Sequence, residues 1–164
     1  MMKVRRFWFG AAVLTMVVFA SMALASRILP PEGIASTAVE EIVRWTSPVN
    51  YMKRHLLQDV ELHGTKMRAG EDLVMFYASA NRDESVFDDP DRFWIERPNA
   101  RRHVAFGYGI HRCVGARLAE LQLRVLLEEL HKRRMRVHVA GDIERVRANF
   151  VHGFRKLEVE ITQF

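Results

Sequence analysis

The stretch that decides the fold is Phe106-Gly107-Tyr108-Gly109-Ile110-His111-Arg112-Cys113-Val114-Gly115, a glycine-punctuated loop that carries the only cysteine of the chain. It leads into a strongly apolar helical segment, residues 115–131. Gly107 and Gly109 permit backbone conformations that other residues rarely adopt, and they let a large flat cofactor approach the chain. Cys113 would lie at the helix N-terminus, where the dipole and free N–H groups favour a metal-binding thiolate. The same pattern also suits a phosphate loop or a redox thiol.

The composition sets limits around this loop. The chain has 164 residues, of which 49% are hydrophobic, so a single packed core is feasible. A lone cysteine cannot form an internal disulfide, which leaves either an inert buried thiol or a functional one. The formal net charge of +5 favours acidic partners, although an excess of this size is also typical of an ordinary solvated surface.

Patterns upstream and downstream of the loop predict the remaining elements. Thr37 and Glu40 have the spacing of a capping box and start a short helix that ends at Ser47-Pro48. The apolar residues of segment 115–131 cover so much of its circumference that we expect it to be mostly buried. We further expect a hairpin of residues 60–62 and 65–67 turning at His63-Gly64, strands at 73–77, 137–139 and 157–161, and an irregular meander over 81–103.

The loop is specific enough to indicate a family. Phe106, Gly107, Gly109, His111, Cys113 and Gly115 match, in order, the haem-ligand loop of cytochromes P-450, and Leu118 and Ala119 continue the pattern. The chain therefore resembles the C-terminal part of that family from Thr37 to about Ile161. The resemblance implies an α+β fold, mainly α, with small β-hairpins, and a thiolate-ligated haem b (iron protoporphyrin IX). It makes Cys113 the metal ligand and catalytic residue, whose thiolate donates electron density to the iron and promotes O–O cleavage.

Further positions follow from the same resemblance. Phe106, Gly107, His111 and Gly115 belong to the implied cofactor site. Arg54, which follows Pro48-Val49, matches a side chain that binds a haem propionate, as does His111. An arginine suits this role because its planar fork binds carboxylates bidentately. The alternative for Arg54 is a solvated basic cluster with Lys53 and His55.

A structural triad is also implied. Glu41 and Arg44 resemble the family's E-x-x-R helix motif, and Pro90-Asp91-Arg92-Phe93 supplies the third member as Arg92. The alternative is an ordinary surface ion pair at i, i+3. Asn81-Arg82-Asp83 matches another family run, which we interpret as structural.

The first 33 residues differ from the rest. Positive residues precede an apolar run from Phe7 to Ala25, and Ala23-Leu24-Ala25 resembles a cleavage site. We therefore divide the chain into a signal-like or transmembrane hydrophobic helix with its linker, residues 1–33, and a haem-binding part, residues 34–164. Either role brings Phe7–Ala25 to a membrane and indicates an anchored or exported protein, whereas the family resemblance implies a cytoplasmic one. The alternative is a truncated or misjoined reading frame.

The resemblance implies a monooxygenase that inserts one oxygen atom from O2 into a C–H bond of an apolar small molecule. Four short segments look most like the bacterial terminal hydroxylases of alkanes and fatty acids: Tyr51-Met52, Asn99-Ala100-Arg101, His111-Arg112-Cys113 and residues 149–153. Electrons would come from an acidic ferredoxin or reductase steered toward Arg101, Arg102, Arg112 and Arg117. Nucleic-acid binding has only charge behind it, so we exclude it.

Catalysis by these residues alone is not expected. No segment before Thr37 resembles the family's central helix, whose acid and alcohol side chains deliver protons to bound dioxygen, and the walls that exclude water are also missing. The competing hypothesis is a non-catalytic haem-binding or membrane-anchored fragment.

Overall fold

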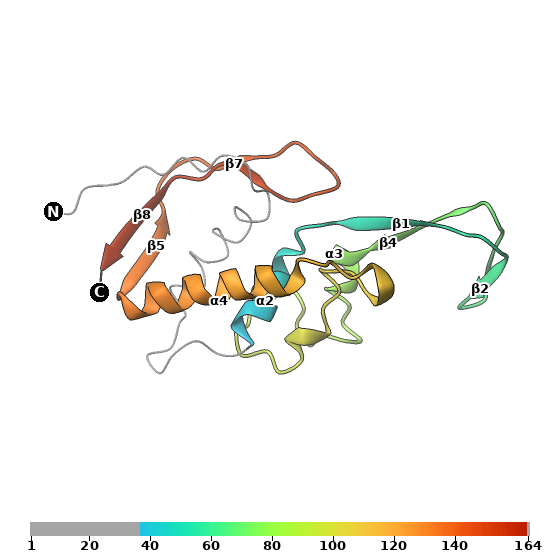
Figure 1. Cartoon of the computed structure of the whole chain (residues 1–164), viewed down its shortest axis with the longest axis horizontal. Coiled ribbons are helices and arrows are strands. Elements are labelled where there is room, and N and C mark those ends of the chain that lie inside the picture. The colour runs from blue at the N-terminus through green and yellow to red at the C-terminus, as the bar shows by residue number, and fades with distance from the viewer. Residues whose placement is uncertain (1–36, 164) are drawn as a thin grey trace.

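Apart from the long helix α4, the helices and strands of the chain are short (Figure 1). The computed structural model describes residues 37–163. In chain order it contains α2 (Ala38–Thr46), β1 (Tyr51–His55), β2 (Val60–Leu62), β3 (Thr65–Met67), β4 (Asp72–Phe76), α3 (Tyr77–Ala80), η1 (Ala100–Arg102), η2 (Gly109–His111), α4 (Ala116–Lys132), β5 (Met135–Val139), β6 (Glu144–Arg145), β7 (Phe154–Lys156) and β8 (Val159–Gln163). Strands cover about as many of the described residues as α-helices do, so the α+β prediction is confirmed, but this part is not mainly α.

The core forms where α2 meets α4. The buried side chains come from both helices, from the segment before Gly107 and from β5: Val39, Ile42, Val43, Ala105, Phe106, Ala116, Ala119, Leu123, Leu127, Leu130 and Val137. Ala105 and Phe106 belong to this core. Apolar packing therefore anchors the start of residues 106–115, here called the cysteine loop. The cysteine loop itself lies at the N-terminal end of α4, on the side of the molecule that carries α3 and β4 (Figure 1).

Each described sheet is a two-stranded antiparallel ribbon. β1 pairs with β4, β2 with β3, β5 with β8 and β6 with β7. The predicted hairpin at 60–67 is confirmed, and His63 and Gly64 both adopt positive φ at its turn. The predicted terminal strands pair as β5 and β8. The predicted strand at 73–77 runs instead from Asp72 to Phe76, because Tyr77 begins α3.

α4 departs from the expectation that it is mostly buried. Its buried face carries Leu123, Leu127 and Leu130, which follow one another at helical spacing. Leu118, Leu121 and Val125 are 60%, 55% and 47% exposed. The prediction was wrong because the apolar composition of a helix does not show how many of its faces have a packing partner.

The capping box predicted at the start of α2 is also absent. Thr37 occupies the N-cap position but makes no side-chain cap hydrogen bond, and its hydroxyl donates to the carbonyl of Ile95 at 2.6 Å. The carboxylate of Glu40 is engaged with His103 and Arg101. Both side chains therefore join α2 to the meander, which competes with local capping.

The predicted hydrophobic helix at Phe7–Ala25 and the linker after it lie outside the described residues. Among helices of the described part, none combines the length and the apolar character needed to cross a bilayer.

Candidate functional site

The backbone of the cysteine loop turns back on its own start. The N–H of Cys113 donates to the carbonyl of Phe106 at 2.8 Å, and the N–H of Arg112 donates to the carbonyl of Gly109 at 3.1 Å. Gly107 and Gly109 have φ of 73° and 68°, so both adopt the left-handed conformation expected of them. The loop therefore brings Cys113 back beside Phe106, directly before the first turn of α4.

Gly107 is required for a second reason. A Cβ at this position would lie 3.2 Å from the hydroxyl oxygen of Tyr77 and 3.4 Å from the carbonyl oxygen of His111. At Gly109 no atom lies within 4 Å of such a Cβ. Tyr77, which is buried at the start of α3, thus supports the loop from outside. Sequence reasoning missed this role because Tyr77 was assigned to the end of a strand.

The thiol of Cys113 is exposed and is not part of a disulfide. Its neighbours Tyr108, Ile110 and Val114 are large apolar residues that are almost fully exposed. A thiolate is a suitable ligand for haem iron, and exposed apolar side chains suit the flat, apolar porphyrin ring. The residues of the loop therefore fit haem. A Cβ added at Gly115 would lie 3.8 Å from the sulfur, which is an ordinary contact distance, so Gly115 lies directly beside the thiol.

The two predicted propionate-binding residues lie on different elements. Arg54 is half-buried on β1, where its Nη1 donates to the carbonyl of Lys53 at 2.9 Å. His111 lies exposed in η2, and within residues 37–163 its ring makes no hydrogen bond or ion pair. The neighbours of Arg54 form a separate cluster, because Lys53 and His55 both bind Asp72, at 2.8 and 3.1 Å.

Glu41 and Arg44 form a fully buried ion pair, so the surface-pair alternative is wrong. Arg44 Nε donates to Glu41 Oε2 at 2.7 Å and Nη2 donates to Oε1 at 2.9 Å. Both side chains have 0% exposure. The N–H of Trp94 also donates to Oε1, at 3.0 Å. The carboxylate is therefore saturated with donors, as burial of a charge demands.

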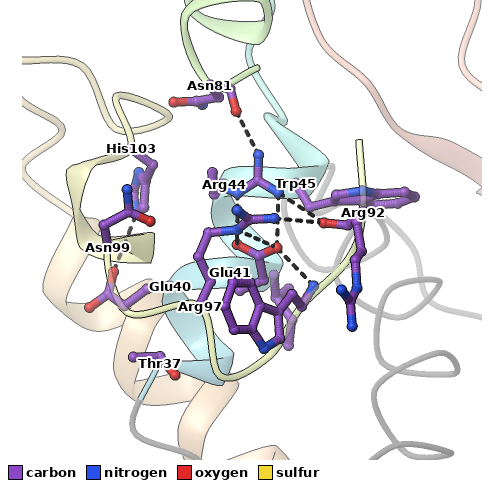
Figure 2. Close-up of polar contacts among 12 residues, drawn as sticks. Thr37, Glu40, Glu41, Arg44, Trp45, Asn81, Arg92, Arg97, Asn99 and His103 are labelled. Atoms are coloured by element: carbon purple, nitrogen blue, oxygen red, sulfur yellow. Dashed lines mark hydrogen bonds and ion pairs between the residues drawn. The ribbon is translucent and has the colours of Figure 1, made fainter. Parts of the chain in front are cut away.

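The third member of this cluster is Arg97, and the prediction of Arg92 was wrong. Arg97 Nε lies 3.1 Å from Glu41 Oε2, and its side chain is 1% exposed. Arg92 contributes only its carbonyl oxygen, which accepts from Arg97 at 2.9 Å and from Arg44 at 3.4 Å. Its guanidinium points away from Glu41 (Figure 2) and lies over the ring of Trp94. Both arginines follow Pro90 in an irregular segment, where no periodicity fixes the direction of either side chain.

Asn81 connects this cluster to the start of the cysteine loop. Arg44 Nη1 donates to the Asn81 carbonyl at 2.6 Å, and Asn81 Nδ2 donates to Ser47 Oγ at 2.9 Å. Asn81 Oδ1 accepts the N–H of Val104 at 2.7 Å. Asn81 is fully buried, which agrees with its interpretation as structural.

Among the four arginines around Cys113 in sequence, three are paired with two acidic side chains. Arg101 Nε lies 3.2 Å from Glu40, whereas Arg112 and Arg117 lie 3.7 and 3.0 Å from the two oxygens of Glu120. Arg102 is exposed. The hydrogen bond from His103, opposed by burial and assisted by Arg101, lowers the pKa of Glu40 below its ordinary value, so this carboxylate stays ionised. Four cations against two anions leave an excess of positive charge.

Comparison with known proteins gives one consistent result. The sequence profile of the family described as Cytochrome P450 matches residues 34–141. The chain is 49% identical over 129 residues to a methyl-branched lipid omega-hydroxylase of Mycobacterium tuberculosis, covering 78% of this chain and 30% of that protein. It is 47% identical over 127 residues to a steroid C26-monooxygenase of Mycolicibacterium smegmatis, with coverages of 76% and 31%.

Among solved structures, the chain is similar to cytochrome P450-153 from Novosphingobium aromaticivorans. The TM-score is 0.80 and the identity 53%, over 91% of this chain and 39% of that one. The chain thus spans about a third of the length of the curated relatives that it matches.

Proposed function

Because this chain belongs to the cytochrome P450 family, we propose that it is the haem-binding part of a haem-thiolate monooxygenase, in which Cys113 would bind the iron through its sulfur. The observation that carries the proposal is the exposed thiol of Cys113, held at the N-terminus of α4 by the bond from its N–H to the Phe106 carbonyl. The boundary between residues 1–33 and 34–164 is part of the proposal, and the profile match beginning at residue 34 supports it.

Each proposed site residue has a distinct task. Haem, when bound, supplies the redox chemistry that activates oxygen. Cys113 would bind the iron, and Gly107 and Gly115 would let the flat ring approach the loop backbone, while the buried ring of Phe106 holds the start of the loop in the core. Arg54 and His111 provide cationic or donor groups for the propionates. Glu41, Arg44 and Arg97 keep the meander on α2 and so preserve the position of the loop.

The reduced carbonyl complex tests the ligand. Full-length chain reconstituted with haem should show the Soret band of thiolate ligation, and Cys113→Ser should lose that band. Val114→Ala alters an exposed neighbour and serves as the matched control. A Soret band typical of histidine ligation in well-folded parent protein would contradict the assignment of Cys113.

We also propose an apolar chain as the substrate. Tyr51, Phe76 and Phe150 form an aromatic cluster, with ring centroids 5.8 and 5.6 Å from Tyr51 to its two neighbours, and Phe76 is 59% exposed. The bridge between Val49 and Val151 holds the two segments together. One relative is named an omega-hydroxylase of methyl-branched lipids and another a steroid C26-monooxygenase, and these names support an apolar class of substrate.

Fatty acids of increasing chain length test this surface. Binding to the haem-reconstituted chain should shift the haem absorption spectrum, and Phe76→Ala should weaken the binding of long chains more than that of short ones. Leu57→Ala removes a more exposed apolar side chain away from the cluster and is the control. Equal weakening by both variants would argue against the aromatic cluster as the substrate wall.

For the electron donor, we propose an acidic ferredoxin or reductase that docks on Arg101, Arg102, Arg112 and Arg117. The excess of positive charge over Glu40 and Glu120 supports this, because complementary charge steers association. Membrane contact through Phe7–Ala25 remains the corresponding proposal for residues 1–33.

A second candidate function is haem binding without catalysis, favoured by the limited coverage of the relatives. Measuring oxygen uptake against hydroxylated fatty acid separates the two. Supplied with haem and with electrons from a ferredoxin and its reductase, the 164 residues alone should reduce oxygen to peroxide without hydroxylated product. Turnover also needs a positioned substrate and exclusion of water. Product formed in proportion to oxygen consumed would establish this chain as a working monooxygenase.

A further inference from the structure

His103 lies four residues before Gly107, the first glycine of the cysteine loop, and its side chain is only 3% exposed. One ring nitrogen, Nε2, lies 3.2 Å from Glu40 Oε2 on α2. The other, Nδ1, lies 3.2 Å from the backbone nitrogen of Ala105, whose N–H points at it. Both nitrogens of a buried imidazole are therefore engaged, one by a side chain and one by the backbone.

These two contacts define the protonation state of the ring. A nitrogen that accepts an N–H bond carries no proton, so Nδ1 is bare and Nε2 carries the hydrogen that it donates to Glu40. In a doubly protonated ring, the Nδ1–H group would face the N–H of Ala105, and two donors would oppose each other. Arg101 Nε is the other charged group on Glu40, and its guanidinium meets the Oε1 atom, on the far side from His103.

The bond to Ala105 fixes the chain where the loop begins. Val104 N–H is held by Asn81 and Ala105 N–H by His103, so two consecutive amides are anchored by side chains. The ring of His103 also packs edge-on against Phe106, with centroids 5.7 Å apart. The backbone carbonyl of Phe106 in turn accepts a hydrogen bond from the N–H of Cys113. A continuous path of contacts therefore joins Glu40 on α2 to the cysteine.

We propose that His103 is a positioning residue for Cys113: Glu40 holds it as the neutral Nε2–H tautomer, and its bare Nδ1 fixes Ala105 and Phe106 against which the cysteine backbone rests. The inference rests on the proposed role of Cys113 for its functional meaning. The tautomer of His103 and its hydrogen bond to Ala105 are properties of the polypeptide, so both can be measured without haem.

The tautomer is measured directly on the unsubstituted full-length chain. Long-range proton–nitrogen NMR correlations distinguish the two neutral imidazole forms from the charged one, after sequential assignment of the seven histidines. At neutral pH we expect His103 to show a protonated Nε2 and an unprotonated Nδ1. A charged ring or an Nδ1–H tautomer would overturn the proposal, whatever the variants do.

Two half-replacements separate the two nitrogens. His103→Asn keeps an acceptor near the position of Nδ1, whereas His103→Gln keeps a donor near the position of Nε2. Hydrogen exchange at the Ala105 amide should be unchanged in His103→Asn and about fivefold faster in His103→Gln, as expected for the loss of one hydrogen bond. Exchange at the Val104 amide, which depends on Asn81, is the internal control for intact structure.

The variants also report on the haem complex. In reconstituted protein, His103→Gln should convert more of the reduced carbonyl complex to the form without thiolate ligation than His103→Asn does. Equal effects of the two variants on exchange and spectrum would contradict positioning through Nδ1 and indicate a side chain that only fills space. If the parent chain lacks a thiolate-type spectrum while the NMR and exchange results hold, the assignment of Cys113 fails and that of His103 does not.

Discussion

Arg97 Nε lies 3.1 Å from the carboxylate of Glu41, and these two buried residues are 56 positions apart in sequence. Because Glu41 also binds Arg44, a single carboxylate accepts hydrogen bonds from two guanidiniums and joins α2 to the end of the meander (Figure 2). The remaining donors of Arg97 reach the carbonyls of Asp88, Asp89 and Arg92. One side chain therefore holds the meander in its folded path.

Removal of Glu41 should be strongly destabilising. Glu41→Ala leaves two buried guanidiniums without their shared anion, a change that typically costs about 3–5 kcal/mol for a buried pair. Urea denaturation measures the loss in the free energy of unfolding. Asp91→Ala, which removes the 83% exposed partner of Arg82, is the control and should cost less than about 1 kcal/mol.

The same experiment distinguishes the two meander arginines. Arg97→Ala should approach the cost of Glu41→Ala, whereas Arg92→Ala should cost no more than about 1 kcal/mol, because its exposed side chain only lies over Trp94. A larger cost for Arg92→Ala than for Arg97→Ala would contradict the assignment of Arg97 as the third member.

The two loop glycines should respond unequally to alanine. Gly109→Ala imposes positive φ on alanine in open space and should cost about 1–2 kcal/mol. Gly107→Ala carries the same backbone cost and also crowds the Tyr77 hydroxyl at 3.2 Å. Thermal unfolding should rank Gly107→Ala as the less stable, and adding Tyr77→Phe should recover part of the difference. No recovery would mean that the hydroxyl is not the limiting contact.

The stability of the chain should depend on Glu40 at acid pH. The folded state lowers the pKa of this carboxyl, chiefly through the hydrogen bond from His103. Its contribution is complete above the ordinary pKa of glutamate and is lost as the pH falls through the lower folded value. The denaturation midpoint of Glu40→Gln should therefore fall less steeply than that of the parent between about pH 5 and 3. Glu61→Gln, on exposed β2, should follow the parent, and a Glu40→Gln profile parallel to it would contradict this linkage.

Association with an acidic electron donor should be sensitive to Arg102. Arg102→Glu reverses an exposed charge and leaves the contacts of Glu40 and Glu120 intact, so it should slow association mainly at low ionic strength. Stopped-flow reduction at several salt concentrations measures the effect. Lys66→Glu, on β3, is a reversal away from the patch. Equal slowing by both variants would indicate a net-charge effect and no docking at the arginines.

Local signals in the sequence predicted those features that local chemistry controls. His63-Gly64 fixed the hairpin, and the glycines around Tyr108 indicated positive φ. The E-x-x-R spacing located Glu41 and Arg44 correctly, but burial came from the meander that folds over them. Features that depend on residues distant in sequence could not be predicted. The hydroxyl of Thr37 donates to the carbonyl of Ile95, 58 residues away, and makes no cap hydrogen bond to α2.

The positions missed at the site have the same cause. Arg97 and Arg92 differ only in which way an irregular backbone turns them, and no residue pattern records that direction. Tyr77 was expected to end a strand, but it begins α3, and its hydroxyl lies against Gly107 from a distant part of the sequence.

The uncovered stripe of α4 has a consequence for handling the protein. Leu118, Leu121 and Val125 lie on one side of the helix at spacings of three and four residues. Contiguous apolar surface of this kind favours colloidal association and binds fluorescent dyes such as anilinonaphthalene sulfonate. The apparent molecular mass from light scattering should therefore rise with protein concentration. Exchanging Leu121 for Gln should reduce both signals while leaving the buried face of Leu123 and Leu127 untouched.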